Sequence, residues 1–337
     1  MKIVLDAMGG DFAPKNEVQG ALMALRAASN RFEVLLVGDE AKLRPLLQEN
    51  GYSNEKLTVV HASEVITMSD SPALAMKQKK DSSMVRGLTL CKEGNGDAFV
   101  SCGNTGAQMA CSLFILGRSQ GVLRPTIGTP FPSEAKNMMI FDAGANVDSK
   151  PEHLLQYAEM GSIYQKLVYG NPAPRVGLLN IGEEETKGTD LIQETYGLLK
   201  EASEKGKINF VGNIEGRDIL MGSAEIILCD GFVGNIVLKF GESVPKFLKA
   251  RFAEFAKKSL FNKLLIGLMR QPLRAMFRTW DPNEFGGVPL LGLNGVSLIS
   301  HGKSSPRGIM NMIFRAEEVV NLEVTKKIAE ALRKEKV

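Results

Sequence analysis

Short apolar runs alternate with amphipathic stretches along most of the chain, and this pattern predicts strands and helices in turn. Nine apolar runs have the length of short buried strands: residues 3–5, 34–37, 57–60, 98–101, 138–141, 176–179, 208–211, 225–228 and 296–299. Segments with apolar residues at helical spacing lie between many of them, for example 17–28 and 154–168. Strands that alternate with helices are typical of a mostly parallel sheet with helices on both faces. We therefore predict an α/β protein in three layers, α/β/α.

The alternation runs through the chain with little sign of a domain boundary. A chain of 337 residues is long enough for one large α/β domain or for two closely associated lobes. The Asn-Pro-Ala-Pro sequence at 171–174 predicts a turn between two such lobes but does not define a boundary. We predict a single α/β domain over residues 1–337 and leave a division into two lobes open.

Polar, glycine-rich segments follow five of the predicted strands. They are residues 6–11, 103–106, 142–146, 180–188 and 230–235. Each segment alone is better explained by local structure than by a ligand site, because Gly supports a tight strand-to-helix turn and Asp, Asn and Thr cap helices. In open α/β sheets, however, ligands bind outside the carboxyl ends of the strands. Five such segments together predict one ligand crevice at that edge of the sheet.

The sequence narrows the kind of ligand that this crevice binds. The dinucleotide fingerprint G-x-G-x-x-G does not follow any predicted strand, and the nucleophile elbow G-x-S-x-G is absent. The segment 301–304 (His-Gly-Lys-Ser) is similar to the end of a P-loop, but the glycine that a P-loop needs is replaced by Ser297. Unpaired amides at a helix N-terminus bind anions. We therefore predict a small anion, with Lys187 on the loop 180–188 as a nearby cation.

Composition and charge argue against several other classes of protein. The net charge of +3 gives no support for nucleic-acid binding. The four cysteines have no C-x-x-C spacing, and with only three histidines we predict no metal site. The N-terminus enters a strand without a signal-peptide pattern, and no apolar stretch reaches the roughly 18 residues that span a bilayer. We expect a protein that is neither secreted nor transmembrane.

Residues 246–282 are predicted to form a basic, amphipathic helix-break-helix insertion. Nine Lys or Arg residues accompany one acidic residue, Glu254, between 246 and 278, and Pro272 is expected to break the helix. Such a helix suits an anionic membrane surface or an acidic partner, and the alternative is a core-facing helix with a solvated basic rim. Six side chains are predicted to contact the membrane: Phe261, Lys263, Leu264, Leu265, Leu268 and Arg270.

A second basic cluster consists of Lys77, Lys79 and Lys80, just after a predicted helix start at Pro72. Lysines in such a position are ordinarily only solvated. If the crevice accepts a substrate carried by an acidic protein, these three lysines are candidates for docking that carrier.

The polar segments, in their order, resemble the bacterial phosphate acyltransferase family known as PlsX. The matching residues run from 4 to about 310 and are 4–11, 79–83, 101–107, 142–146, 183–188 and 229–235. The resemblance implies transfer of a fatty acyl group from acyl carrier protein to inorganic phosphate, giving acyl phosphate for phospholipid synthesis without a cofactor. It also implies a fold like isocitrate and isopropylmalate dehydrogenases, related in architecture to phosphate acetyltransferase. Members are expected to be cytoplasmic homodimers, peripherally bound to the inner face of the membrane, where a glycerol-3-phosphate acyltransferase uses the product.

Direct attack of phosphate on the thioester carbonyl is the mechanism that we predict, because no Ser or Cys has an identifiable base partner. Cys102 as an acyl-carrying nucleophile is the alternative. The residues predicted to act in catalysis are Lys187, Asn104 and Asp230. Those predicted to bind substrate are Asp6, Gly103, Thr105, Gly106, Asp142, Asn146, Thr186 and Asn235.

Two rival functions remain open at this point. One is another enzyme on the same scaffold, either a phosphate acetyltransferase that uses a coenzyme A thioester or a dehydrogenase without its fingerprint. The other is a non-catalytic, membrane-associated scaffold in which the polar segments are only turns.

Overall fold

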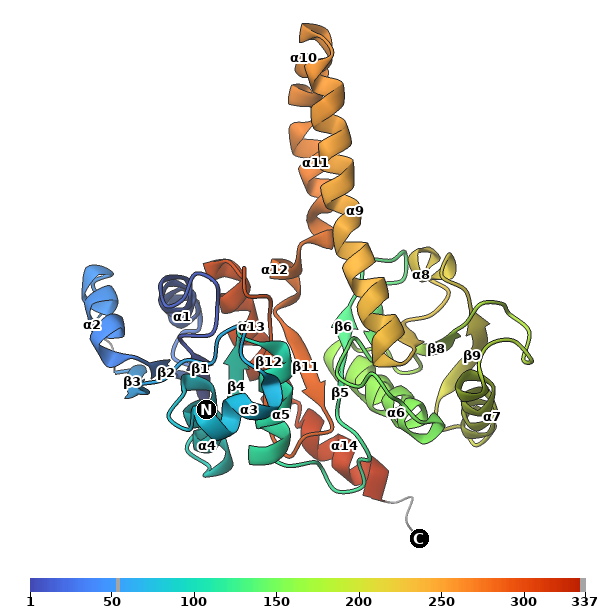
Figure 1. Cartoon of the computed structure of the whole chain (residues 1–337), viewed down its shortest axis with the longest axis horizontal. Helices are drawn as coiled ribbons and strands as arrows, with labels where there is room; N and C mark the ends of the chain where they lie inside the picture. Colours follow the sequence, from blue (N-terminus) through green and yellow to red (C-terminus); the bar gives the residue numbers. More distant parts are fainter. Residues whose placement is uncertain (53–54, 334–337) are drawn as a thin grey trace.

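The computed structural model describes residues 1–52 and 55–333, and the strands in this part of the chain form two sheets (Figure 1). The larger sheet has the order β3-β2-β1-β4-β12-β11-β5, and the smaller has the order β6-β7-β10-β8-β9. The strands are β1 (Lys2–Asp6), β2 (Glu33–Gly38), β3 (Leu57–His61), β4 (Ala98–Ser101), β5 (Thr126–Ile127), β6 (Thr129–Pro130), β7 (Met139–Phe141), β8 (Arg175–Leu179), β9 (Asn209–Ile214), β10 (Ile226–Leu228), β11 (Val288–Leu291) and β12 (Val296–Ile299).

The larger sheet and its helices form the first lobe. The five strands from β3 to β12 in the sheet order are parallel, and β11 is antiparallel to both of its neighbours. One face packs on α1 (Lys15–Ala27), α2 (Glu40–Glu49) and α13 (Pro306–Asn321). The other face packs on α4 (Ser83–Lys92) and α5 (Thr105–Ile115), and α3 (Pro72–Gln78) contacts α5. Side chains alternate between the faces along β1, because Ile3 and Leu5 join one core and Val4 joins the other.

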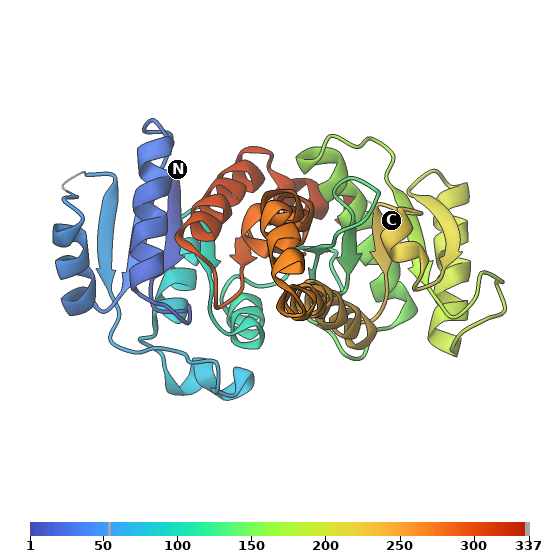
Figure 2. The same ribbon diagram turned by 90° about the horizontal axis from the view of Figure 1, so that it is seen from above.

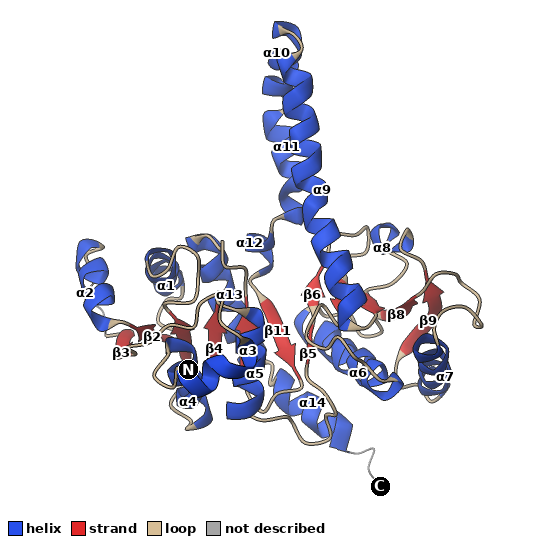
Figure 3. Cartoon of the chain, viewed as in Figure 1, coloured by secondary structure: helices blue, strands red, loops and turns tan. Residues whose placement is uncertain are grey.

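The smaller sheet and its helices form the second lobe. Its strands β7, β10, β8 and β9 are parallel, and β6 is antiparallel to β7. One face packs on α6 (Pro151–Val168), α7 (Asp190–Glu204) and α14 (Val324–Arg333). The other face packs on α8 (Asp218–Met221) and on the first turns of α9 (Gly231–Lys257). Each sheet therefore has helices on both faces, as Figure 3 shows.

The two lobes are joined where the chain passes from β5 to β6. Only Gly128 lies between these strands, and a Cβ atom there would lie 2.0 Å from a ring carbon of Phe141. Any larger residue would therefore collide with the Phe141 ring on β7. A small core is also shared between the lobes, since Ile127, Leu290 and Ile299 of the first pack with Ala143 of the second.

A helical hairpin projects from the body over the junction of the two lobes (Figures 1 and 2). Helix α9 runs outward, and α10 (Leu260–Leu268), α11 (Arg270–Met276) and the 3₁₀ helix η1 (Phe277–Trp280) return toward α12 (Pro282–Phe285). The rings of Phe252 and Phe277 lie 6.5 Å apart and link the outward and returning arms.

The position of the break predicted at Pro272 is wrong. The chain reverses at Lys258 and Ser259, where the Ser259 hydroxyl accepts a hydrogen bond from the amide of Asn262 (3.0 Å) and caps α10. Pro272 instead lies in the first turn of α11, where its missing N–H leaves no intrahelical bond unmade. The outward arm also begins before residue 246, because α9 continues through Pro245 without interruption.

The three-layer α/β prediction is confirmed, and all nine predicted strands are present within a few residues. Three strands were missed. β5 and β6 have two residues each, and β11 contains Pro289, so none of them forms a recognisable apolar run.

Candidate active site

The polar segments lie at the carboxyl ends of neighbouring strands, in two groups. In the first lobe, the segments that follow β1 and β4 are adjacent because these strands pair in parallel. In the second lobe, the segments that follow β7, β10 and β8 are adjacent for the same reason. The sheet topology therefore brings the predicted site residues together within each lobe, and the two groups can meet only across the junction of the lobes.

Asp6 lies beneath the surface of the first group. Its side chain is 1% exposed, and its carboxylate accepts hydrogen bonds from the Ser101 hydroxyl (2.7 Å) and the Met8 amide (3.1 Å). The Ser101 oxygen in turn accepts from the amide of Gly103 (3.0 Å). Burial raises the pKa of Asp6, although hydrogen bonds from Ser83 and Ser101 oppose this effect. Asp6 thus ties the segments after β1 and β4 together from below.

Asn104 caps helix α5, and its carboxamide is occupied at both ends. The side-chain oxygen accepts from the amide of Ala107 (3.0 Å). The side-chain nitrogen donates to the carbonyls of Thr67 and Asp70, at 3.2 Å each. Asn104 therefore fixes the loop between β3 and α3 against the start of α5.

Thr105 and Gly106 form the exposed first turn of α5. The first amides of a helix have no intrahelical partner, and of these the Ala107 amide is already bonded to Asn104. The amides of Thr105 and Gly106 remain at the positive end of the helix dipole. This turn can therefore bind an anion through two backbone N–H groups.

Asp142 has the corresponding buried position in the second lobe. Its carboxylate is fully buried and accepts from the backbone amides of Ile127 (3.3 Å), Ala145 (3.0 Å) and Asn146 (2.6 Å), as well as from the Asn146 side chain (2.9 Å). Burial raises the pKa of Asp142, and these hydrogen bonds oppose it. The Asn146 side chain also donates to the carbonyl of Pro125 (2.8 Å), so the pair connects both lobes.

The start of α9 packs directly on this segment. Asp230 caps the helix by accepting from the amide of Val233 (2.8 Å). A Cβ atom at Gly234 would lie 1.9 Å from the carbonyl oxygen of Asp142, so only glycine fits. Asn235 lies beside Gly144, on the same segment. The predicted residues Asp142, Asn146, Asp230 and Asn235 are therefore one group in the structure.

Lys187 and Thr186 are exposed on the loop between β8 and α7. The Lys187 ammonium group makes no ion pair with any residue of the described chain. A Cβ atom at Gly182 would lie 3.1 Å from Cγ of Lys187, so the lysine stem passes over the Gly182 backbone. This lysine is a free positive charge at the carboxyl edge of the second sheet.

Two residues that hold these segments, Ser101 and His301, were not predicted to do so from the sequence. Ser101 ends a strand that reads as purely apolar, and its role depends on Asp6 from another strand. His301 follows β12, and its Nε2 atom lies 3.5 Å from a carboxylate oxygen of Glu242 on α9, so this pair links the two lobes. Neither contact has a local sequence signal.

The three lysines of the second basic cluster differ in their surroundings. Lys79 donates to the Asp70 carboxylate (2.5 Å) and the Val65 carbonyl (2.7 Å). This contact with Lys79 lowers the pKa of Asp70 to about 2. Lys77 and Lys80 are exposed and form no ion pair with other described residues.

The predicted membrane-contacting side chains lie on the outer part of the hairpin. Phe261 is 67% exposed and Leu268 is 71% exposed, and Leu264 and Leu265 are exposed with them. Lys263 and Arg270 are exposed as well. None of the helices in residues 1–52 and 55–333 is long and apolar enough to cross a membrane.

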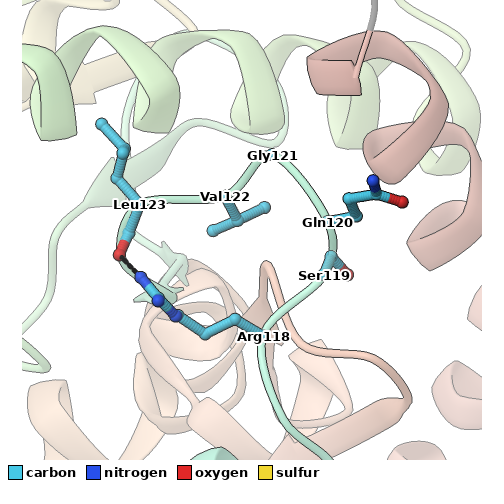
Figure 4. Close-up of a pocket in the computed structure, with 6 residues that line it drawn as sticks. All are labelled: Arg118, Ser119, Gln120, Gly121, Val122 and Leu123. Atoms are coloured by element: carbon cyan, nitrogen blue, oxygen red, sulfur yellow. Dashed lines mark hydrogen bonds between the residues drawn. The ribbon is translucent and has the colours of Figure 1, made fainter. Parts of the chain in front are cut away.

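A surface pocket lies apart from the predicted site. It is lined by Arg118–Leu123, the loop after α5, where the Arg118 side chain donates to the Leu123 carbonyl (Figure 4). This loop contains none of the predicted site residues.

Within the described chain, no cluster of three or more His, Cys, Asp or Glu side chains could hold a metal ion.

Comparison with known proteins gives both a family and a fold. Residues 1–327 match the family model described as "Fatty acid synthesis protein". A phosphate acyltransferase from Chlorobaculum parvum is 52% identical over 339 residues, which cover 98% of this chain and 99% of that protein. Among solved structures, a phosphotransacetylase from Staphylococcus aureus is 17% identical with a TM-score of 0.57, over 95% of this chain and 94% of that one.

A 4-hydroxythreonine-4-phosphate dehydrogenase from Klebsiella pneumoniae has a TM-score of 0.52 at 14% identity, over 95% of this chain and 98% of that one. These two neighbours confirm the predicted dehydrogenase-like fold and its likeness in architecture to a phosphotransacetylase. The family model and the near full-length relatives show that the chain belongs to the phosphate acyltransferase (PlsX) family of acyltransferase enzymes.

Proposed function

We propose that this enzyme transfers a fatty acyl group from acyl carrier protein to inorganic phosphate, releasing free carrier and acyl phosphate for phospholipid synthesis. The observation that carries the proposal is the exposed first turn of α5 at the carboxyl edge of the sheet, where the amides of Thr105 and Gly106 have no intrahelical partner. A small anion such as phosphate suits these donors. The unpaired ammonium of Lys187 supplies a positive charge from the other lobe.

The reaction is direct. A phosphate oxygen attacks the thioester carbonyl carbon, the C–S bond breaks, and the proton of hydrogen phosphate ends on the leaving thiolate. Lys187 stabilises the negative charge that develops on the carbonyl oxygen or on phosphate. Asp230 and Asn235 orient the reactants from the start of α9, and Asn104 shapes the anion-binding turn.

An acyl-enzyme on Cys102 is disfavoured by its surroundings. The thiol is fully buried, and burial raises its pKa far above the usual value, with the carboxyl group of Glu17 adding to the effect. A thiol that remains protonated is a poor nucleophile. Isolation of an acylated Cys102 would refute the direct mechanism.

Carrier docking involves Lys77 and Lys80, which present free positive charge to an acidic protein. Lys79 contributes by holding the loop through Asp70. Replacing both exposed lysines with Ala is expected to raise KM for the acyl carrier substrate and leave KM for phosphate unchanged. A rise in KM for phosphate alone would contradict this role.

The hairpin binds the inner face of the cell membrane, so that the protein is cytoplasmic and peripherally attached. Exposed apolar side chains beside unpaired basic ones are the features of an interfacial helix. The apolar product would then reach a membrane glycerol-3-phosphate acyltransferase without crossing water. The proposal includes a homodimer, which light scattering of the purified protein would test.

The decisive experiment mixes the protein with a long-chain acyl carrier protein and phosphate, and traps acyl phosphate with hydroxylamine. Acyl hydroxamate that needs both enzyme and phosphate supports the proposal. Product with acetyl coenzyme A but none with the carrier would retain the phosphate site and change the donor. No product with either thioester would favour a non-catalytic scaffold.

A further inference from the structure

Side-chain amides of residues on neighbouring elements donate hydrogen bonds to the backbone of the loop that carries Lys187. Gln193, on the first turn of α7, donates from Nε2 to the carbonyls of Thr186 (2.9 Å) and Gly188 (3.2 Å). Asn180, at the end of β8, donates from Nδ2 to the carbonyl of Lys187 (3.1 Å). The peptide groups on both sides of the lysine are therefore fixed to two different elements of the lobe.

The upstream part of the loop has its own support. Asn213 on β9, which is 8% exposed, donates from Nδ2 to the carbonyl of Glu184 (3.0 Å). The amide of Lys187 donates to the same carbonyl (3.1 Å) and closes a tight turn. The lysine stem lies over Gly182, where even a methyl group would be in close contact. Both the backbone and the stem of Lys187 are thus constrained.

Acidic side chains of the same loop are held by other cations. Glu185 accepts from the Tyr196 hydroxyl and the Lys200 ammonium group, at 3.0 Å each. The hydrogen bond from Lys200 is the main cause of a lowered pKa of Glu185. Glu183 lies 3.5 Å from the guanidinium of Arg217. These two carboxylates are therefore paired with cations other than Lys187, whereas the Glu184 carboxylate lies beside Gly182, as the Lys187 stem does.

We propose that Gln193 is a positioning residue. Together with Asn180 and Asn213, it holds the loop so that the Lys187 ammonium group stays where it stabilises charge during acyl transfer. The inference rests on the proposed function, in which Lys187 stabilises charge during acyl transfer. A charge that is fixed before the reaction avoids the cost of reorganisation. A displacement of about 1 Å in such a group can reduce the rate about a hundredfold.

Replacement of Gln193 by Leu removes both donated hydrogen bonds and keeps a side chain of similar size. We expect kcat of Gln193→Leu to fall about tenfold to a hundredfold, with KM for the acyl carrier protein and the melting temperature unchanged. The matched control is Gln48→Leu, an exposed carboxamide on α2 that makes no hydrogen bond within the described chain. Equal kcat values for both variants and the wild type would overturn the proposal.

A double-mutant cycle separates positioning from a general structural role. If Gln193 acts through Lys187, then Gln193→Leu has no further effect in a Lys187→Ala background. The same fold-loss in both backgrounds would overturn the proposal. Wild-type activity of Lys187→Ala would instead refute the lysine's part in the proposed function.

A labelling experiment tests positioning without any turnover. Competitive acetylation with acetic anhydride, read by mass spectrometry, reports the relative reactivity of each lysine amine. We expect the reactivity of Lys187 to change in Gln193→Leu and to stay constant in Gln48→Leu, relative to Lys166 in each protein. Unchanged Lys187 reactivity in Gln193→Leu would overturn the positioning role, whatever the kinetic result.

Discussion

Glu17 is a buried carboxyl group whose ionisation opposes folding. It lies in the first turn of α1, is 1% exposed, and its Oε2 atom has no hydrogen-bond partner in the described chain. Burial raises the pKa of Glu17 from the ordinary 4.5 to about 7, and the nearby carboxylate of Asp6 adds to the effect. Between these two pH values, the folded protein keeps a proton that the unfolded chain releases.

This difference sets the sign and the size of the prediction. A pKa that is raised from 4.5 to about 7 corresponds to about 3 kcal/mol of stability. Because the group is an acid with a raised folded-state pKa, that stability is present below pH 4.5 and is lost as the pH rises to 7. Above pH 7 the folded protein has to hold a buried carboxylate, and the loss is complete.

Replacement of Glu17 by Gln removes the titration while it preserves the shape of the side chain. Urea unfolding at pH 5 and pH 8 measures the free energy of unfolding of both proteins. From pH 5 to pH 8, we expect the free energy of unfolding of Glu17→Gln to rise by about 2 to 3 kcal/mol relative to that of the wild type. The control Glu49→Gln, exposed on α2, should show no such gain. If the difference between Glu17→Gln and the wild type is the same at both pH values, the reasoning is refuted.

Three further predictions concern the site, the packing and the hairpin. Lys187→Ala should lower kcat in the hydroxamate assay about a hundredfold to a thousandfold with unchanged thermal unfolding, because it removes a charge-stabilising donor, and wild-type turnover would contradict this. Gly234→Ala should lower the free energy of unfolding, measured in urea, by about 1 to 3 kcal/mol, because its Cβ atom would collide with the Asp142 carbonyl. The control Gly197→Ala, where the Cβ atom has open space within α7, should be neutral or slightly stabilising. Leu264→Glu should weaken flotation with anionic vesicles, and high salt should weaken flotation of the wild type; equal flotation would argue against the membrane role.

Much of the fold could be predicted from the sequence because parallel strands are buried on both faces. Strands such as β4 and β10 therefore read as continuous apolar runs. The hairpin was harder to delimit. In the inner half of α9 the fully buried residues are Gly231, Gly234 and Gly241, and Val233, Val237 and Leu238 pack beside them only partly buried. Its outer half and the returning helices have no buried residues to set their limits.

The site could be predicted only in part, because a motif shows where a segment turns and not what its side chains contact. The glycine-rich segments do follow strand ends as expected. Whether an acidic residue in them faces solvent or the interior depends on partners from other strands, such as Ser101 for Asp6. The same holds for Gln193, whose role follows from the position of α7 beside the Lys187 loop.

The arrangement also explains how acidic residues can surround a site proposed for phosphate. Asp6 and Asp142 are almost fully buried, and backbone amides and neighbouring side chains surround their oxygens. A carboxylate that is satisfied in this way organises a loop without presenting its charge to an incoming anion. Among the exposed groups of these segments, the amides of Thr105 and Gly106 and the ammonium of Lys187 attract negative charge. Substituting Asp6 or Asp142 should therefore act through the shape of the loops, and substituting Lys187 should act on the chemistry alone.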